Sequence, residues 1–338
     1  MYHRWVNDLL FGLFYMSTKK FLIPDGIEYY TGADAILLEK LKSSVLKIFN
    51  KYNFEFVVTP VIDSIDNLNN LNEDNHKNLN ISLSNLNDLG IRADITPQIS
   101  RLDYQSNNLN KSNKYCYMGD IYRETVSPFD RNNPFQAGAE YFGKISKKID
   151  IILIKMCYEI ISLSKSKKIV IELNDSFFIN NYLDSLKLKK SESNILKNLI
   201  NLKSKAEIKE FFRINKISKY KLNELIDLMA LSGPASLIKN LTIFCKKYKY
   251  NSEENIKNLS NIIKDIKSLK NIEIIFDICS FKSMDYEKGF NYAFYVEDFR
   301  KPIALGGRYV SYKSSDGAVR DATGFSIDLK DIVMVYEK

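Results

Sequence analysis

Apolar residues recur along the chain with two different periods, and each period predicts a different kind of element. The clearest helix covers residues 31–52, because Leu38, Leu41, Val45 and Ile48 recur every three or four positions and form one apolar stripe. The stretch NFEFVVTP follows directly, and its apolar and polar residues alternate in the way that is typical of a strand. A helix followed by a strand is therefore predicted near the start of the folded region.

Local signals mark where this helix begins and where the strand ends. Thr31 and Asp34 have the spacing of a capping box, in which side chains accept hydrogen bonds from the free N–H groups of the first turn. Pro60 ends the strand, because proline has no N–H to donate to a sheet. The tract rich in asparagine and leucine at residues 65–89 has no clean period, so we expect a long loop with a weak strand.

Further strand-like segments stand on both sides of a long stretch with helical character. Those before it are GIRADIT, KYCYMGDIYRE, FQAGAEYFG and, after a predicted helix at residues 150–164, KIVIELND. Over residues 176–270 the apolar spacing is helical, with one internal break at Gly233 and Pro234. The strands then resume with NIEIIFDI, FNYAFYVE, PIALGG and ATGFSIDL.

This order of elements predicts a fold class and a domain plan. Strands before and after a helical block indicate one antiparallel sheet with an inserted helical domain, and short strands with a few helices favour the α+β class. We expect an N-terminal extension at residues 1–20, a core at 21–175 and 271–338, and the helical insertion at 176–270. Neither a GxGxxG nor a GxxxxGK[ST] pattern occurs, so neither a Rossmann nor a P-loop site is indicated.

Composition changes this picture little. Of the 338 residues, 45% are hydrophobic and 27% are charged, as is ordinary for a globular protein. The net charge of +8 invites a nucleic-acid interpretation. Lysine is nevertheless spread over every segment, which is more typical of a solvated surface than of a track of phosphate contacts. We therefore expect no nucleic-acid partner.

The thiols and imidazoles exclude some kinds of site. The four cysteines stand singly, without the spacing of metal ligands: Cys116, Cys157, Cys245 and Cys279. We expect buried free thiols, a cytoplasmic location, and neither a metal nor a cofactor. Only two histidines occur, so acid–base catalysis by histidine is not indicated. The apolar stretch WVNDLLFGLFYM is too short to span a bilayer, and no membrane attachment is predicted.

Polar side chains on the predicted strands are candidates for a ligand site. Asp94 and Thr96 are two positions apart, and Gln136 and Glu140 are four apart, so each pair is expected on one face of a strand. Two carboxylates, an amide and a hydroxyl can hold an ammonium group and a second hydrogen-bonding group. The pattern suits a free amino acid. The alternative is that each residue caps a strand or pairs with a surface lysine.

Four arginines are candidates for anion contacts: Arg92, Arg101, Arg123 and Arg308. Arginine is scarce in this lysine-rich chain, and its planar fork suits a carboxylate or a phosphate. A structural salt bridge is the alternative for each of them.

Taken together and in this order, several segments resemble the catalytic core of histidyl-tRNA synthetase, a class II synthetase. VVTPVID is similar to the first class motif, whose proline lies at a dimer interface. YCYMGDIYRETVSP resembles the second motif and ATGFSIDLKD the third, while SFKSMDYEKGF and LGGRYV occupy the places of two histidine-specific motifs. The resemblance covers most of residues 20–175 and 272–338. It implies a class II synthetase-like antiparallel sheet flanked by helices, a helical insertion, and dimerisation through the core.

The resemblance also implies which residues would contact histidine. Asp94, Thr96, Gln136 and Glu140 fit the family's polar pattern, and the two histidine-specific motifs add further positions. The complete implied set is Asp94, Thr96, Arg123, Gln136, Glu140, Lys282, Tyr286, Gly306, Gly307 and Arg308.

Four departures from the synthetase pattern affect the nucleotide and the catalytic positions. Thr125 replaces a glutamate of the second motif, Lys282 a catalytic arginine, Glu287 a tyrosine, and Asp331 the arginine that packs on ATP. Exchanging a cation for an anion about 4 Å from a phosphate charge changes the interaction by roughly 8 kcal/mol at an effective dielectric constant near 20. The sequence also stops soon after Asp331, where a synthetase continues into an anticodon-binding domain.

A site that suits the amino acid but has lost the nucleotide chemistry is similar to that of the ATP phosphoribosyltransferase regulatory subunits, which are synthetase paralogues. FLIPDGIE, IRADITPQISRLD and ATGFSIDL resemble that family especially closely. The resemblance implies a non-catalytic subunit of a hetero-oligomer with the short catalytic transferase. It would support activity in the first step of histidine biosynthesis and transmit feedback inhibition by L-histidine. The alternatives are a shortened active histidyl-tRNA synthetase and a synthetase-like amino-acid-binding module with another partner.

Overall fold

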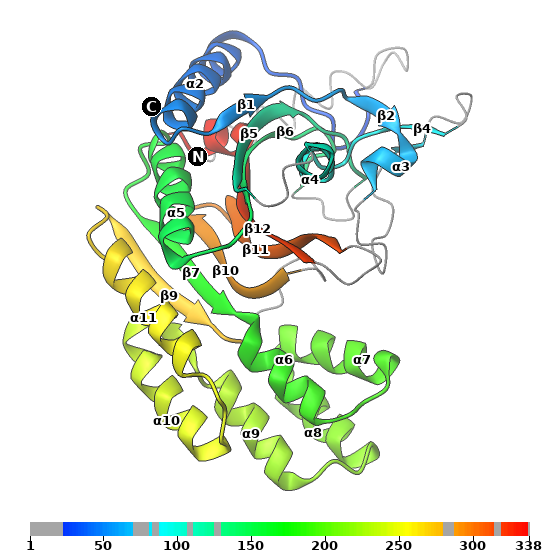
Figure 1. The fold of residues 1–338 in the computed structure, drawn as a ribbon, viewed down its shortest axis with the longest axis vertical. Helices are drawn as coiled ribbons and strands as arrows, with labels where there is room; N and C mark the ends of the chain where they lie inside the picture. Colours follow the sequence, from blue (N-terminus) through cyan, green and yellow to red (C-terminus); the bar gives the residue numbers. More distant parts are fainter. Residues whose placement is uncertain are drawn as a thin grey trace, which may run out of the picture.

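The structure is a computed structural model, and it describes residues 23–69, 81–82, 88–106, 111–124, 130–279, 287–313 and 319–336. The expected N-terminal extension lies outside these residues. The described chain forms a large sheet with helices on both faces, and a helical region extends from one end of that sheet (Figure 1).

Nine strands of the described chain form the main sheet, in the order β1-β5-β6-β12-β11-β10-β7-β9-β8. Neighbouring strands are antiparallel except β1 with β5 and β7 with β9, which are parallel. The α+β class is confirmed, but the sheet is mixed rather than wholly antiparallel. Its strands are β1 (Glu55–Val57), β5 (Asn113–Asp120), β6 (Phe135–Phe142), β7 (Ile169–Asp175), β8 (Ser232–Pro234), β9 (Ile272–Asp277), β10 (Glu287–Val296), β11 (Ala304–Lys313) and β12 (Val319–Asp328).

A second, small sheet stands beside the main one and corrects a prediction. It contains β2, β4 and β3 in that order, with the short helix α3 after β2. The segment GIRADIT was expected to be a strand, but β4 ends at Ile91 and helix α4 begins at Thr96. Pro97 favours the first turn of a helix, and the Asp94 carboxylate accepts a hydrogen bond from the Thr96 N–H at 3.1 Å. The bounds are β2 (Ile62–Ser64), α3 (Ile65–Leu68), β3 (Ile81–Ser82), β4 (Leu89–Ile91) and α4 (Thr96–Gln105).

Helix α2 (Gly32–Lys51) is the helix predicted from the first apolar stripe. It buries Leu41, Val45 and Phe49 and lies near α5 and α12. Thr31 is its N-cap residue, but the Thr31 side chain accepts no hydrogen bond, so the expected capping box does not form. Burial of the apolar stripe, rather than a capping contact, therefore holds this helix in place.

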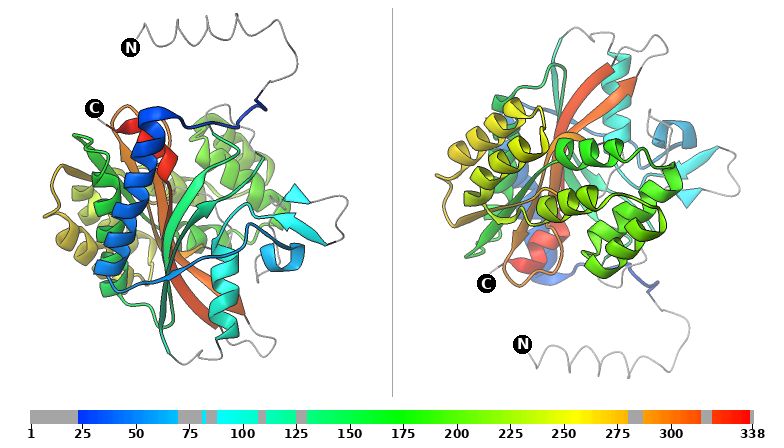
Figure 2. Two further views of the ribbon diagram at one scale, coloured as in Figure 1. Left: turned by 90° about the horizontal axis from the view of Figure 1, so that it is seen from above. Right: turned by 90° about the horizontal axis from the view of Figure 1, so that it is seen from below.

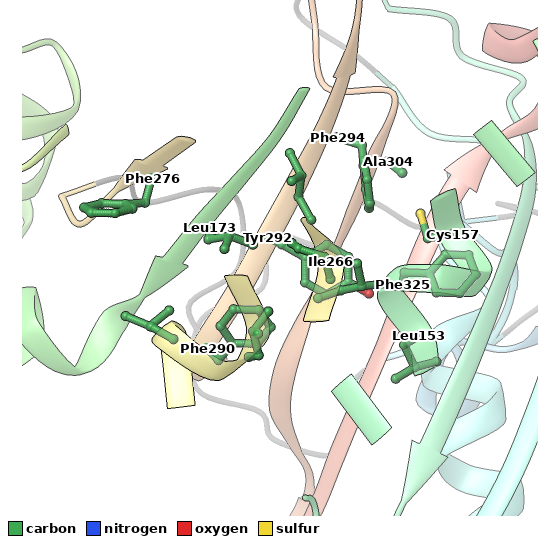
Figure 3. Close-up of a cluster of buried hydrophobic side chains, with 14 of the residues drawn as sticks. Leu153, Cys157, Leu173, Ile266, Phe276, Phe290, Tyr292, Phe294, Ala304 and Phe325 are labelled. Atoms are coloured by element: carbon green, nitrogen blue, oxygen red, sulfur yellow. The ribbon is translucent and has the colours of Figure 1, made fainter. Parts of the chain in front are cut away.

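The main apolar core lies between the sheet and α5 (Lys147–Ser162). Leu153 and Cys157 of α5 pack over the sheet, where Tyr292, Phe294 and Phe325 meet them from β10 and β12 (Figure 3). Helix α4 covers the opposite face, against β6 and β11. We call the two faces of the sheet the α5 face and the α4 face, after the helices that cover them. The C-terminal helix α12 (Leu329–Val335) follows β12 directly.

Helices occupy most of the stretch where an insertion was predicted, and they cover one end of the sheet in the view from below (Figure 2). Asp175 at the end of β7 accepts a hydrogen bond from Phe177 N–H and begins the first of them. The break at Gly233 and Pro234 is the edge strand β8, which pairs with β9. Residues 176–270 therefore contribute one strand to the main sheet, and their status as a separate domain stays a prediction. Their helices are α6 (Ser176–Ser185), α7 (Lys190–Asn201), α8 (Lys205–Ile214), α9 (Lys219–Met229), η1 (Ala235–Leu237), α10 (Ile238–Tyr248) and α11 (Glu253–Ile266).

The predicted thiols are found as expected, since all four cysteines are buried and free. Within the part of the chain that the structure describes, no helix is long and apolar enough to cross a membrane.

Candidate functional site

Glu140 lies in the middle of β6 and is buried on the α4 face of the sheet. Gly324 is its direct partner on β12, and a Cβ atom there would lie 1.8 Å from Glu140 Oε2. Gly138, two positions away on β6, leaves room in the same way for the hydroxyl of Tyr117. Glycines therefore open the space into which these polar side chains pack.

Hydroxyl groups from three different elements converge on the Glu140 carboxyl group. Tyr309 OH on β11 donates to Oε2 at 2.9 Å, and Thr96 Oγ1 at the start of α4 donates to Oε1 at 3.3 Å. Thr96 Oγ1 also shares a hydrogen bond of 3.1 Å with Tyr117 OH on β5. The carboxyl group thus joins strands β5, β6 and β11 to the helix that covers them.

Burial raises the pKa of Glu140 to about 8, although the hydrogen bond from Tyr309 opposes this change and the nearby Asp94 carboxylate adds to it. Near neutral pH the site therefore holds a proton on Glu140. A ligand cation beside the carboxylate could take the place of that proton, because an opposite charge stabilises the ionised form.

Asp94 and Gln136 extend the same cluster towards the loop before α4. Gln136 Nε2 donates to Asp94 Oδ1 at 2.7 Å, while Gln136 Oε1 accepts from Ile95 N–H at 2.9 Å. Both ends of the amide are therefore fixed by the loop, and the loop is tied to β6. The structure brings together the four residues of the sequence-derived amino-acid site, Asp94, Thr96, Gln136 and Glu140, even though the strand expected for the first two is absent.

Arg308 lies on the other face of the sheet, because neighbouring residues of a strand point to opposite sides and Tyr309 points towards Glu140. Arg308 Nε donates to Asp150 Oδ2 of α5 at 3.1 Å, and Thr323 Oγ1 donates to Asp150 Oδ1 at 3.2 Å. The structure therefore gives Arg308 the structural salt bridge that was its alternative interpretation.

Gly306 and Gly307 have packing reasons for being glycine. A Cβ atom on Gly306 would lie 2.5 Å from Cζ of Tyr292, and one on Gly307 would lie 2.6 Å from Cβ of Asn291. Both neighbours are on β10, which pairs with β11 at these positions. The two glycines let β10 and β11 pack side by side.

Of the remaining predicted positions, only Arg123 lies among the residues that the structure describes. Arg123 follows the end of β5, is half-buried, and donates its backbone N–H to the Asn132 carbonyl at 3.0 Å. Lys282 and Tyr286 lie outside the described residues, as does Thr125. For these three residues the sequence interpretation stays a prediction.

Arg92 and Arg101 hold loops in place. Arg92 is buried, and it donates from Nε to the Asp120 carbonyl at 2.8 Å and from Nη1 to the Thr59 carbonyl at 2.9 Å. Arg101 donates to the backbone carbonyls of Asp66 and Asn69. Both guanidinium groups therefore bind backbone oxygens of this chain.

Asp331, which the sequence resemblance aligns with the ATP-packing arginine of the synthetases, is buried in a group of ion pairs. Arg131 Nη1 contacts Asp331 Oδ1 at 3.2 Å and Asp328 Oδ2 at 2.7 Å. Arg131 Nε contacts Glu28 Oε2 at 2.9 Å, and Lys301 Nζ lies 3.3 Å from Asp331 Oδ2. Burial and the neighbouring Asp328 raise the pKa of Asp331 to about 6, against the opposing effect of Arg131 and Lys301.

Several residues of these clusters were not predicted from the sequence. Tyr117 and Tyr309 are in quoted motifs, and strand alternation could have placed both on the Glu140 face. Arg131 gave a weaker signal, because its partners Glu28, Asp328 and Asp331 come from distant parts of the sequence. Among the described residues, no three His, Cys, Asp or Glu side chains are placed to hold a metal ion.

Known proteins resemble this chain over most of its length. A family model described as histidyl-tRNA synthetase matches residues 26–332. An ATP phosphoribosyltransferase regulatory subunit of Polynucleobacter asymbioticus is 27% identical over 321 residues, covering 92% of this chain and 81% of that protein.

Two solved structures have the same fold. One is an ATP phosphoribosyltransferase regulatory subunit/histidyl-tRNA synthetase from Bacillus halodurans, with a TM-score of 0.78 at 16% identity, covering 95% of this chain and 84% of that one. The other is a chain of the ATP phosphoribosyl transferase (HisG:HisZ) complex from Thermotoga maritima, with a TM-score of 0.66 at 18% identity, covering 87% and 97%. The predicted class II synthetase-like fold is thereby confirmed.

Proposed function

The chain belongs to the histidyl-tRNA synthetase family, and from this premise we infer that it is a regulatory subunit of ATP phosphoribosyltransferase. Relatives with that name match more than nine-tenths of its length. Its fold is shared with a chain of a transferase complex. The catalytic transferase subunit is therefore its partner, and histidine biosynthesis is its pathway.

The single observation that carries the non-catalytic role is the environment of Asp331. By the sequence resemblance, Asp331 takes the place of the family's ATP-packing arginine, and its buried carboxylate is ion-paired with Arg131 and Lys301. A carboxylate that is already paired inside the chain cannot supply the cationic contact that an arginine would give to ATP, which a synthetase needs in order to activate its amino acid. We propose that this chain does not catalyse aminoacylation.

The effector in this proposal is L-histidine, bound at Asp94, Thr96, Gln136 and Glu140. Their convergence on the α4 face supports it, because two carboxyl groups, an amide and a hydroxyl suit an amino acid with a basic side chain. Arg123, Lys282 and Tyr286 complete the set by resemblance. A protonated amino or imidazole group beside Glu140 would displace the proton that burial keeps on that carboxyl.

Regulation then requires that histidine favours one state of the complex over another. A change in the charge of Glu140 alters its hydrogen bonds to Tyr309 and Thr96, which belong to β11 and α4. These two elements are the route by which the proposed pocket acts on the rest of the core.

Self-association through the core is proposed for the segment that resembles the first class motif. Phe56, Val58, Val61 and Ile62 are all exposed there, with Val58 exposed to 79%. Such a run of exposed apolar side chains is typical of an interaction surface. A cytoplasmic location stays a prediction from the four free thiols.

Calorimetry tests the proposed effector site directly. Histidine is titrated into the chain alone and into its complex with the catalytic subunit, and the titrations are repeated with Glu140→Ala and Asp94→Ala. The proposal expects weaker binding by both variants, and unchanged binding by both would remove these residues from the site. Histidine-dependent exchange between ATP and pyrophosphate would instead favour the alternative of a shortened active synthetase.

A further inference from the structure

Helix α4 carries a second buried polar side chain in its first turn, besides the one that reaches the Glu140 cluster. Thr96, the first residue of the helix, donates a hydrogen bond to Glu140 Oε1 at 3.3 Å. Gln98 is also buried. Successive residues of a helix are about 100° apart, so the side chains of Thr96 and Gln98 leave the helix on nearly opposite sides. The first turn of α4 therefore joins the Glu140 cluster to the residues that Gln98 contacts.

Gln98 contacts the segment for which self-association was proposed. Its Nε2 donates to the Pro60 carbonyl at 3.0 Å and to Asp63 Oδ2 at 3.0 Å. Pro60 is exposed and lies within the run of exposed apolar side chains. Helix α4 correspondingly packs between the main sheet and α3, which follows this segment (Figure 1). We call the exposed apolar side chains of the segment the motif surface: Phe56, Val58, Val61 and Ile62.

Arg92 holds the same backbone from the other end of the loop before α4. Its Nη1 donates to the carbonyls of Thr59 and Pro60 at 2.9 and 3.2 Å, and its backbone N–H donates to the Val61 carbonyl at 3.1 Å. The Arg92 side chain is buried. Three consecutive carbonyls behind the motif surface therefore accept hydrogen bonds from residues 92–98, the segment that also carries two of the four candidate ligand residues.

We propose that self-association through the motif surface and occupation of the amino-acid site depend on each other, with Gln98 as the positioning residue that links them. This link rests on the function inferred above and is a regulation of the same site. Coupling between two sites passes through the hydrogen bonds and rigid elements that join them. A ligand that changes the bond between Thr96 and Glu140 shifts the first turn of α4. The shift moves Gln98 against the backbone behind the motif surface.

The alternative is that Gln98 only stabilises the fold, and the local hydrogen bonds allow the two roles to be separated. The Pro60 carbonyl also accepts from Arg92. The Asp63 carboxylate also accepts from Asn67 Nδ2 at 2.9 Å. Loss of the Gln98 amide therefore leaves neither acceptor group without a donor. The fold should tolerate Gln98→Met, which keeps the length of the side chain and removes its hydrogen bonds.

The test measures one coupling from both sides. The dimer dissociation constant of the full chain is measured by sedimentation velocity without L-histidine and with saturating L-histidine. The affinity for L-histidine is measured by calorimetry at protein concentrations below and above that constant. Gln98→Met is compared with Gln105→Met, the same substitution at the exposed last residue of α4. If circular dichroism shows that Gln98→Met is unfolded, Asp63→Ala removes one of the same bonds from the other end and is read in the same way.

In the wild type and in Gln105→Met, L-histidine should change the dimer dissociation constant by at least about fivefold. Dimerisation should change the affinity for L-histidine by the same factor, because linkage between two binding sites is reciprocal. In Gln98→Met both factors should fall below about twofold, while the variant still binds L-histidine and still dimerises.

The possible failures are distinct. An unchanged factor in Gln98→Met overturns its linking role and leaves it a structural residue. A wild type that binds L-histidine and dimerises without coupling overturns the inference alone. A wild type that binds no L-histidine overturns the proposed effector site as well, and one that stays monomeric overturns the proposed self-association together with the inference.

Discussion

The substitution Glu140→Gln tests the physical state of the candidate site. The ordinary pKa of a glutamate is 4.5, and burial raises that of Glu140 to about 8. Between these values the folded chain holds a proton that the unfolded chain has released. The contribution of this proton to the free energy of unfolding is therefore fully present below pH 4.5 and is lost as the pH rises towards 8.

The magnitude follows from this window. Each pH unit inside it lowers the free energy of unfolding by about 1.4 kcal/mol, so the step from about pH 5.5 to about pH 7.5 costs roughly 2–3 kcal/mol. Glutamine has the shape of the neutral acid and no proton to lose. The difference in unfolding free energy between Glu140→Gln and the wild type should therefore grow in favour of the variant by this amount.

Urea unfolding followed by circular dichroism at several pH values measures this difference. All other titrating groups, including Asp331, are shared by both proteins and cancel in the comparison. Glu254→Gln, at an exposed position of α11, is the matched control and should give a curve parallel to that of the wild type. If Glu140→Gln is also parallel, Glu140 is ionised in the folded chain and the reasoning is refuted.

Four further substitutions, of which Lys209→Gly is a control, test other parts of the structure. Among the described residues the buried Tyr292 hydroxyl has no hydrogen-bond partner, so Tyr292→Phe should raise the free energy of unfolding by about 1–2 kcal/mol; a loss would reveal a partner. Lys216 follows α8 with a φ of 52°, so Lys216→Gly should stabilise by about 1 kcal/mol in thermal unfolding, while Lys209→Gly inside α8 should destabilise by a similar amount. A Cβ atom at Gly324 would lie 1.8 Å from Glu140 Oε2, so Gly324→Ala should cost about 3 kcal/mol or more, and a neutral result would mean that the carboxyl group lies elsewhere.

Much of the fold could be predicted because its elements follow simple periodicities. The apolar stripe that includes Leu41 and Val45 predicted α2. The alternation of apolar and polar residues predicted the central strands on either side of the insertion. Strand β8 could not be predicted from periodicity. Three residues with Gly233 and Pro234 carry the pattern of a turn, and only pairing with β9 makes them a strand.

The loop before α4 shows where local and tertiary signals differ. RADITPQ alternates like a strand, but Asp94 accepts the Thr96 N–H and Pro97 favours a helical turn. The four residues of the candidate site lie together despite this error, because their chemistry depends on which side chains meet and not on the element that carries them. Asp94 and Thr96 reach Gln136 and Glu140 from a loop and a helix end as well as they would from a strand.

Contacts between distant segments could be anticipated least. Arg308 resembled an anion ligand in the sequence, and only the packing of α5 on the sheet shows that Asp150 lies beside it. Arg131 is similar, because its carboxylate partners come from both ends of the chain. A charged residue in a strand or loop says which interaction it can make, whereas the fold decides which partner it meets.

We expect this chain to control a partner enzyme and to perform no synthetase chemistry. The most direct measurement adds the purified chain to the short catalytic transferase subunit and follows the joining of ATP to phosphoribosyl pyrophosphate. The rate should rise on addition of the chain and fall again when L-histidine is added. A rate that does not respond to the chain would contradict this expectation.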